Sequence, residues 1–200
     1  MRLFASPTSP YARKVRALVI ERGLQDQVEE VWINPLGDAD ALQVANPLGK
    51  VPTLILDDGR TIMDSAVITA WLDTIGPARR LIPIDGDARL DTLTREAIAD
   101  GMMDAIFALT MERRRPSEQQ SPEWIGRWTA AIRRSVERYS ALPPPQREPD
   151  LGDLALAVAL LQADFRLPHL KWSSKAPALR AWLEQLSQRS SLMKTALPAA

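Results

Sequence analysis

The chain of 200 residues is long enough for one domain or two small ones. Its 25 basic and 25 acidic side chains cancel, which argues against a general binder of nucleic acid or anionic membranes. It has no cysteine, which excludes disulfides, cysteine-ligated zinc and a cysteine nucleophile. Because there is only one histidine, a histidine-based metal cluster is excluded as well, and we expect no metal.

The sequence has no pattern that directs a chain into or across a membrane. Its first residues, Met1–Ala5, run directly into polar sequence and lack the apolar core of a signal peptide. The longest uninterrupted apolar run, Leu154–Leu161, has eight residues, far fewer than a membrane-spanning helix needs. We therefore expect a cytoplasmic protein that does not bind membranes.

The first 76 residues alternate between strand-like and helical patterns. Asp57-Asp58-Gly59-Arg60 separates two apolar runs, and Asp-Gly in this setting is typical of a β-hairpin. The predicted order is strand, helix, strand, a long connection, a hairpin and a helix, which favours a small mixed α/β sheet. The predicted elements are strands over Leu3–Ala5, Val28–Ile33, Thr53–Leu56 and Thr61–Met63, helices over Tyr11–Arg22 and Ser65–Ile75, and a loop over Asn34–Lys50.

From Arg89 onward only helical spacing of apolar residues remains. Asp153–Phe165 is apolar nearly all round, which is typical of a central helix in a bundle. Gly76, Pro77 and Pro83 break both patterns between the two halves. The sequence therefore predicts an α/β domain over residues 1–76, a linker over 77–88 and an all-helical domain over 89–200.

Three local features carry a resemblance to a known family. Ser9-Pro10-Tyr11-Ala12-Arg13-Lys14-Val15-Arg16 opens the first helix, Asn46-Pro47-Leu48-Gly49-Lys50-Val51-Pro52-Thr53-Leu54 leads into the third strand, and Asp64-Ser65 opens the next helix. In this order, ahead of an all-helical half, they resemble the glutathione S-transferase superfamily, in particular its bacterial serine-type members. The resemblance covers essentially the whole chain. It implies a thioredoxin-like N-terminal domain followed by a helical bundle, and glutathione as co-substrate.

Ser9 is the candidate catalytic residue. At a helix N-terminus, free backbone amides and the helix dipole favour an anion, and a hydroxyl there can donate to a thiolate. Both effects lower the pKa of a bound thiol from about 8.5 towards neutral. The resemblance implies that this thiol belongs to glutathione. Ser9 could instead only cap the helix, and Ser6, just past the first strand, is the second candidate for the thiolate partner.

The other two motifs supply the predicted glutathione-binding residues. The resemblance implies a cis bond between Val51 and Pro52, so that Val51 presents its backbone N–H and carbonyl to an extended peptide. It also places Lys50 beside the glycyl carboxylate, Ser65 at the γ-glutamyl carboxylate and Asp64 at the γ-glutamyl ammonium. The alternatives are a solvated lysine in a loop and residues that simply cap a helix.

The helical half contributes the remaining candidates by the same resemblance. Many family members form homodimers in which an acidic residue of this half reaches the partner's γ-glutamyl amine, and we assign that role to Asp100. A solvated helix face is the alternative for Asp100. The second substrate is expected over the thiol, in contact with Tyr11, Met103, Ile106, Phe107 and Met111, although most of these also suit core or dimer contacts.

Two further patterns stand near helix ends. Asp150-Leu151-Gly152-Asp153 resembles the family's capping motif before the central helix, and we interpret it as a feature of folding rather than of chemistry. Arg113-Arg114-Arg115 complements the dipole at a helix C-terminus, or attracts an anionic substrate. His169 is predicted to be a loop or packing residue.

The favoured function is a glutathione-dependent transferase that directs the thiolate at an electrophilic carbon or a peroxide. The alternative is a non-catalytic binding or regulatory protein of the same fold, of the kind represented by stringent starvation protein A, which docks on RNA polymerase. The joint presence of Ser9, Val51-Pro52 and Asp64-Ser65 favours the transferase, because a pure scaffold has no need of all three. The missing cysteine weighs against disulfide exchange.

Overall fold

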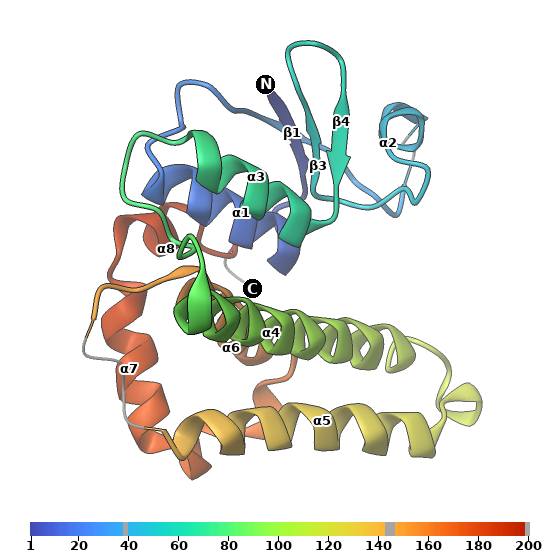
Figure 1. Cartoon of the computed structure of the whole chain (residues 1–200). Coiled ribbons are helices and arrows are strands. Elements are labelled where there is room, and N and C mark those ends of the chain that lie inside the picture. Colours follow the sequence, from blue (N-terminus) through green and yellow to red (C-terminus); the bar gives the residue numbers. More distant parts are fainter. Residues whose placement is uncertain (38–39, 143–146, 199–200) are drawn as a thin grey trace. The chain divides into compact units, whose positions relative to one another are not determined.

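The computed structural model describes residues 1–37, 40–142 and 147–198, and within it the chain forms two compact units (Figure 1). The first comprises Met1–Thr92 together with the C-terminal segment that begins at Ser190, and the second comprises Leu93–Arg189. These units therefore group residues 77–88, which the sequence analysis assigned to a linker, with the sheet-containing part of the chain.

The first unit is built on a four-stranded mixed sheet in the order β2-β1-β3-β4. β1 pairs in parallel with β2, and β3 pairs antiparallel with β4, as the sequence predicted. β1 also pairs antiparallel with β3. Two helices, α1 and α3, pack side by side against one face of the sheet (Figure 1). The bounds are Arg2–Ala5 for β1, Glu29–Trp32 for β2, Thr53–Ile55 for β3, Thr61–Met63 for β4, Pro10–Glu21 for α1 and Ser65–Ile75 for α3.

The predicted loop between β2 and β3 contains a short helix, α2 (Asp40–Ala45), that the sequence analysis did not predict. Residues 38–39 of that loop lie outside the described residues. Leu42 of α2 is fully buried and packs with Phe4 of β1 and with Val51. A six-residue helix is too short to be stable alone. It forms because Leu42 covers the face of the sheet to which Phe4 points.

A buried ion pair holds the end of α3 to the end of α1. Arg22 Nε lies 3.3 Å from Asp73 Oδ1, and both side chains are almost completely buried. The Asp73 carboxylate also accepts hydrogen bonds from the backbone N–H groups of Leu81 (2.8 Å) and Ile82 (3.1 Å). A Cβ at Gly76 would lie 2.6 Å from the Cβ of Arg22, so only glycine fits there. These contacts explain why residues that follow α3 belong to the first unit.

The C-terminal segment belongs to the first unit because it packs on α1. The short helix α8 (Ser190–Lys194) lies against α1, where Arg13 Nη2 donates to the carbonyl of Leu192 at 3.2 Å. The hydroxyl of Ser191 donates to Glu21 Oε1 at 2.5 Å. Burial, together with the nearby charge of Arg16, lowers the pKa of Arg13 to about 10. The segment is separated from α1 by most of the sequence, so its docking is a purely tertiary feature.

The second unit is helical throughout its described residues apart from connecting turns. Its central helix, α6, is buried on nearly every side from Leu151 to Leu160, as its apolar pattern predicted.

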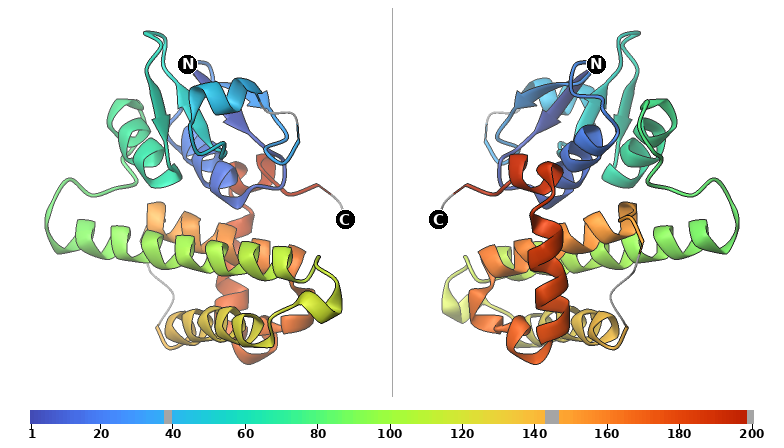
Figure 2. Two further views of the ribbon diagram at one scale, coloured as in Figure 1. Left: turned by 90° about the vertical axis from the view of Figure 1, so that its right-hand side faces the viewer. Right: turned by 90° about the vertical axis from the view of Figure 1, so that its left-hand side faces the viewer.

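In Figure 2, α7 crosses the direction of α4. None of the described helices has the length and apolarity that a membrane crossing requires. The helices are α4 (Gly86–Glu112, which begins in the first unit), α5 (Pro122–Ser140), α6 (Leu151–Arg166) and α7 (Pro177–Ser187), with 3₁₀ turns η1 (Ser117–Gln119), η2 (Pro168–Leu170) and η3 (Trp172–Lys175).

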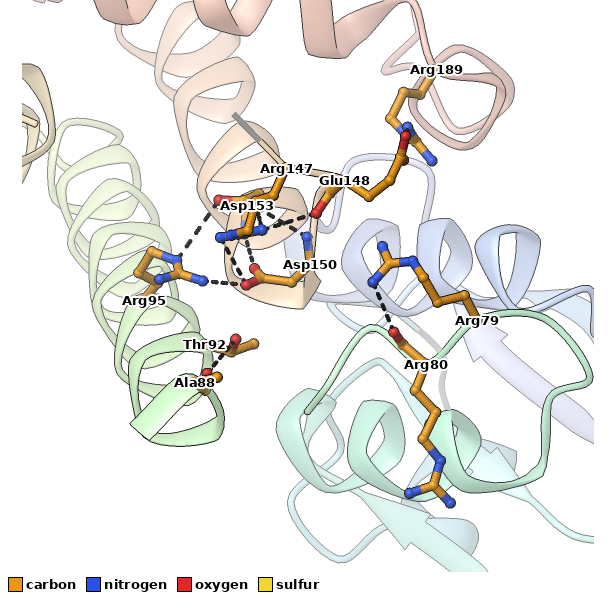
Figure 3. Close-up of polar contacts among 10 residues, drawn as sticks. All are labelled: Arg79, Arg80, Ala88, Thr92, Arg95, Arg147, Glu148, Asp150, Asp153 and Arg189. Carbon is orange, nitrogen blue, oxygen red and sulfur yellow. Dashed lines mark hydrogen bonds and ion pairs between the residues drawn. The ribbon is translucent and has the colours of Figure 1, made fainter. Parts of the chain in front are cut away.

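The N-terminus of α6 carries the predicted reciprocal cap. Asp150 Oδ1 accepts from the N–H of Asp153 at 3.1 Å, and Asp153 Oδ2 accepts from the N–H of Asp150 at 3.0 Å. Arg95 from α4 pairs with Asp150, and Arg147 pairs with Asp153 at 2.7 Å (Figure 3). Burial raises the pKa of Asp153. Two arginines thus neutralise a pair of carboxylates that burial alone would disfavour.

We expect the substitution Asp150→Ala to lower the stability of the protein by about 2 kcal/mol, because it removes a helix cap and leaves Arg95 without one of its carboxylate partners. Asp150→Asn, which keeps a capping oxygen, should lose less. Urea denaturation followed by circular dichroism measures the change. Asp87→Ala, which removes an exposed first-turn acid of α4, is the control and should shift the midpoint little. An unchanged midpoint for Asp150→Ala would contradict this role of the cap.

Candidate functional site

The topology of the sheet brings the three sequence motifs to one edge. Phe4 of β1 is paired with Thr53 of β3, and Thr53 is paired with Met63 of β4. Because β3 is antiparallel to its neighbours, the residues before Thr53 lie at the same edge as those that follow β1 and β4. That edge therefore carries Ser9, Val51 and Ser65, together with the N-termini of α1 and α3, whose dipoles both favour negative charge.

Ser9 is the N-cap of α1, as predicted. Its Oγ accepts a hydrogen bond from the N–H of Ala12 at 3.2 Å, and its backbone carbonyl accepts from Arg13 at 3.0 Å. Ser9 is half-buried, and the hydrogen of its hydroxyl has no acceptor within the described residues. Since the cap uses only the oxygen as an acceptor, the hydroxyl can still donate to a ligand. Ser6, the other predicted candidate, is also half-buried, and its carbonyl accepts from the N–H of Ser9 at 3.1 Å.

A buried asparagine organises the segment that leads into β3. Asn46 is 1% exposed, and its Nδ2 donates to the carbonyl of Lys50 and to Thr53 Oγ1, both at 3.0 Å. Thr53 Oγ1 donates in turn to the same carbonyl at 2.8 Å. Asn46 and Thr53 belong to the motif that carried the family resemblance, but no role was predicted for either of them. An asparagine in a tight loop was itself a signal for such a role, because its side-chain amide can form hydrogen bonds with several backbone groups.

This network presents the backbone of Val51 at the edge of the sheet. The peptide bond between Val51 and Pro52 is cis, as predicted. Val51 lies before the first ladder residue of β3, and its backbone N–H and carbonyl have no partner in the part of the chain that the structure describes. Its side chain packs with Phe4 and Leu42. Lys50 turns its carbonyl towards Asn46, while the residue as a whole is exposed.

The tetrapeptide Asn-Pro-Leu-Gly occurs twice, at residues 34–37 and 46–49, and both copies form the same turn. The side chain of Asn34 accepts from the N–H of Leu36 at 3.1 Å, and that of Asn46 accepts from the N–H of Leu48 at 2.9 Å. Asn34 is exposed and makes only local contacts, whereas Asn46 is buried and reaches β3. The same local turn therefore has a positioning role at only one of the two places.

The N-terminus of α3 is the third component of the edge. Asp64 is its N-cap and accepts from the N–H of Ala66 at 2.8 Å. Its φ of 71° lies in a region that a residue other than glycine rarely adopts, and such strain is common where a protein binds a ligand. Ser65 is 5% exposed, and its hydroxyl has no partner among the described residues. A hydroxyl next to a helix N-terminus suits a carboxylate.

A pocket opens where the parallel strands β1 and β2 end. Crevices at the carboxyl ends of parallel strands are common ligand sites, and of the residues that line this one only Ser6 was a predicted site residue. Trp32 is 49% exposed there, and the guanidinium of Arg16 lies 4.7 Å from the centre of its ring. The lining residues are Ser6, Pro7, Trp32, Ile33 and Asn34.

The candidates from the helical half have diverse environments. Asp100 is half-buried on α4 and has an interaction partner. Met103 and Ile106 are fully buried, whereas Phe107 is 51% exposed. Their assigned roles, and those of the half-buried Tyr11 and Met111, stay predictions. Within the described residues, no group of three acidic, histidine or cysteine side chains could hold a metal ion.

Comparison with known proteins finds similarity over the whole chain. The family model described as the N-terminal domain of glutathione S-transferase matches residues 8–75, and that of the C-terminal domain matches residues 122–185. The uncharacterized GST-like protein YibF of Escherichia coli (strain K12) is 32% identical, and the alignment covers 100% of both chains.

Two similar solved structures contain glutathione. A glutathione transferase family member from Pseudomonas fluorescens Pf-5, with bound glutathione, is 37% identical over 99% of each chain, with a TM-score of 0.95. A glutathione S-transferase from Methylobacillus flagellatus KT, also with glutathione bound, is 34% identical over 98% of this chain and 99% of its own, with a TM-score of 0.93.

Asn46→Ala should destabilise the protein by about 2–4 kcal/mol, because several buried polar groups lose their partners at once. Asn34→Ala, the matched control, removes the same local turn contact from an exposed position and should cost about 1 kcal/mol or less. Thermal unfolding compares the two variants, and amide hydrogen exchange reports whether the N–H groups of Leu48 and Gly49 lose protection. Equal losses of stability for the two variants would contradict the special role of Asn46.

Proposed function

Because the chain belongs to the glutathione S-transferase superfamily, we propose that it binds glutathione at the edge of its sheet and activates the thiol as a thiolate. The observation that carries the proposal is the half-buried hydroxyl of Ser9. It caps α1 through its oxygen, which leaves its hydrogen available to a sulfur atom at the positive end of the helix.

The edge offers a complementary partner to each part of the tripeptide. The backbone N–H and carbonyl of Val51 would pair with the extended backbone of the cysteinyl residue. The hydroxyl of Ser65 and the N-terminus of α3 would hold the γ-glutamyl carboxylate, and the exposed carboxylate of Asp64 would lie by its ammonium group. The amine of Lys50 would reach the glycyl carboxylate.

This arrangement would activate glutathione without a covalent bond to the protein. The thiol releases its proton to solvent, and the hydroxyl of Ser9 then donates to the sulfur anion. Each pKa unit by which the bound thiol is lowered corresponds to about 1.4 kcal/mol of preferential binding of the thiolate. The thiolate would then attack an electrophilic carbon, or the oxygen of a peroxide, held beside it.

The second substrate and the assembly are part of the same proposal. The pocket at the ends of β1 and β2, where Trp32 offers an exposed aromatic surface, suits an apolar or aromatic electrophile. From the helical half, Met103, Ile106, Phe107 and Met111 are the proposed further contacts, together with Tyr11 of α1. We propose a homodimer in which Asp100 of each protomer contacts glutathione bound to the other.

Ser9→Ala should raise the pKa of the thiol of bound glutathione by about one to two units while changing its affinity little, because the loss falls on the charged form. A pH titration of the ultraviolet thiolate absorbance in the presence of bound glutathione measures it. Ser121→Ala is a matched control. Ser121 also precedes a proline at a helix start and accepts from the N–H three residues on, at 3.3 Å. An unaltered thiolate titration in Ser9→Ala would move the role to Ser6 or to backbone amides.

Ser65→Ala should weaken glutathione binding about tenfold, the effect of one charge-assisted hydrogen bond. At a glutathione concentration of about one hundred times the Kd of the unaltered protein, ligand stabilisation of about 2.7 kcal/mol would fall to about 1.4 kcal/mol. Thermal shift assays and calorimetry provide the measurement. Thr61→Ala, at the opposite end of β4, is the control. Absence of any glutathione-induced shift in the unaltered protein would favour the non-catalytic binding protein.

A further inference from the structure

A cluster of positive charge stands at the ends of two helices of the second unit, and the proposed glutathione chemistry does not use it. Two arginines that directly follow α4 lie beside the last residue of α6 and a histidine of the 3₁₀ turn η2. We call this group the basic cluster, and its members are Arg113, Arg114, Arg166 and His169.

Arg113, which follows α4, is in direct contact with His169 of η2. Nη1 of Arg113 lies 2.6 Å from Nε2 and 3.4 Å from Nδ1 of His169. At that distance the arginine donates to an imidazole that must be neutral, because a protonated imidazole has only donors. Partial burial and the charge of Arg113 accordingly lower the pKa of His169, and burial and the charge of Arg114 lower the pKa of Arg166.

No carboxylate neutralises the cluster within the described residues, because the acidic side chains around it are engaged elsewhere. Asp164 of α6 accepts from Trp172 at 2.8 Å and from Arg180 at 2.7 Å. Glu112 of α4 accepts from the N–H of Ser121 at 2.7 Å and pairs with Arg115 at 3.5 Å. The nearby η2–η3 segment adds the exposed cations Lys171 and Lys175.

The arginines of the cluster are not needed to cap their helix. The helix C-terminus favours cations in general, but the carbonyls of Leu109, Met111 and Glu112 already accept from backbone N–H groups of the turn that follows α4. The side chain of Gln120 donates to the carbonyls of that turn, those of Arg113 (3.4 Å) and Arg115 (2.9 Å). The guanidinium groups of Arg113 and Arg114 are exposed, and neither has a carboxylate partner in the described part of the chain.

We propose that the basic cluster is a binding site for a doubly charged tetrahedral oxyanion, either sulfate or a phosphoryl group. Guanidinium groups bind such oxygens with paired, charge-assisted hydrogen bonds. An anion between Arg113 and His169 would replace the contact between the two side chains and would favour the protonated imidazole. Binding of the anion and protonation of His169 are therefore linked, and the anion binds more tightly as pH falls through the titration of His169.

His169 reports on this site directly because it is the only histidine of the chain. Its imidazole C–H signals can be followed by NMR from about pH 5 to about pH 8, the range in which histidine titrates, in sodium chloride and in sodium sulfate of equal ionic strength. We expect the pKa of His169 to be higher in sulfate than in chloride. Identical titration curves in the two salts would overturn the proposal.

Substitutions separate the site from a general effect of charge. Arg113→Gln should raise the pKa of His169 in chloride, because a neighbouring charge is gone, and should weaken sulfate binding about tenfold. Arg115→Gln is the matched control, since its guanidinium already pairs with Glu112. It should leave the response to sulfate unchanged, and a loss as large as that in Arg113→Gln would overturn the assignment.

A comparison of inorganic phosphate with O-phosphoserine at constant pH identifies the source of the anion. Tighter binding of O-phosphoserine would show that the site takes a phosphoryl group on a larger ligand, and equal binding would show that it takes the free ion. No response of His169 to sulfate, phosphate or O-phosphoserine would overturn the proposal. Ser9→Ala should respond to sulfate like the unaltered protein, so the outcome is independent of the proposed glutathione site.

Discussion

The candidate site depends above all on the buried amide of Asn46. This one side chain, 1% exposed, holds the carbonyl of Lys50 and the hydroxyl of Thr53 at 3.0 Å each. It thereby sets the path of the chain between α2 and β3. The polar groups of this network satisfy one another, as a buried network requires to be stable. The backbone groups of Val51 lie outside it and have no partners in the described part of the chain.

The chemistry of the edge comes from the backbone more than from charged side chains. α1 and α3 start at the same edge of the sheet, and each is capped by an oxygen, from Ser9 and from Asp64. Helix N-termini place partial positive charge there at no cost of desolvating a full cation. That suits a peptide ligand with a thiolate and a carboxylate, as in the proposed binding of glutathione.

The second unit contains two groups of charged side chains that differ in whether their charges are paired. At the start of α6, Asp150 and Asp153 are closely paired with Arg95 and Arg147, and the whole group is tied to a helix cap (Figure 3). At the ends of α4 and α6 the cations have no such partners among the described residues. The contrast fits a stabilising role for the first group and the proposed anion site for the second.

Much of the fold and part of the site could be predicted from the sequence, because the relevant interactions are local. The Asp-Gly hairpin, the cap formed by Ser9 and the bounds of α3 follow from neighbouring residues. The family resemblance added the cis bond before Pro52. The helix α2 could not be predicted, because it exists only where Leu42 meets Phe4.

Tertiary structure alone determines which of the two Asn-Pro-Leu-Gly turns positions the candidate site. Asn34 and Asn46 stand in the same Asn-Pro-Leu-Gly sequence and make the same local hydrogen bond. Only Asn46 is enclosed by the sheet and α2, where its second donor finds β3. Likewise, the docking of Leu192 on Arg13 and the contact of Arg113 with His169 join residues distant in sequence. Periodicity and motifs report on residues that are close in sequence, whereas contacts between residues distant in sequence are determined by how the chain packs.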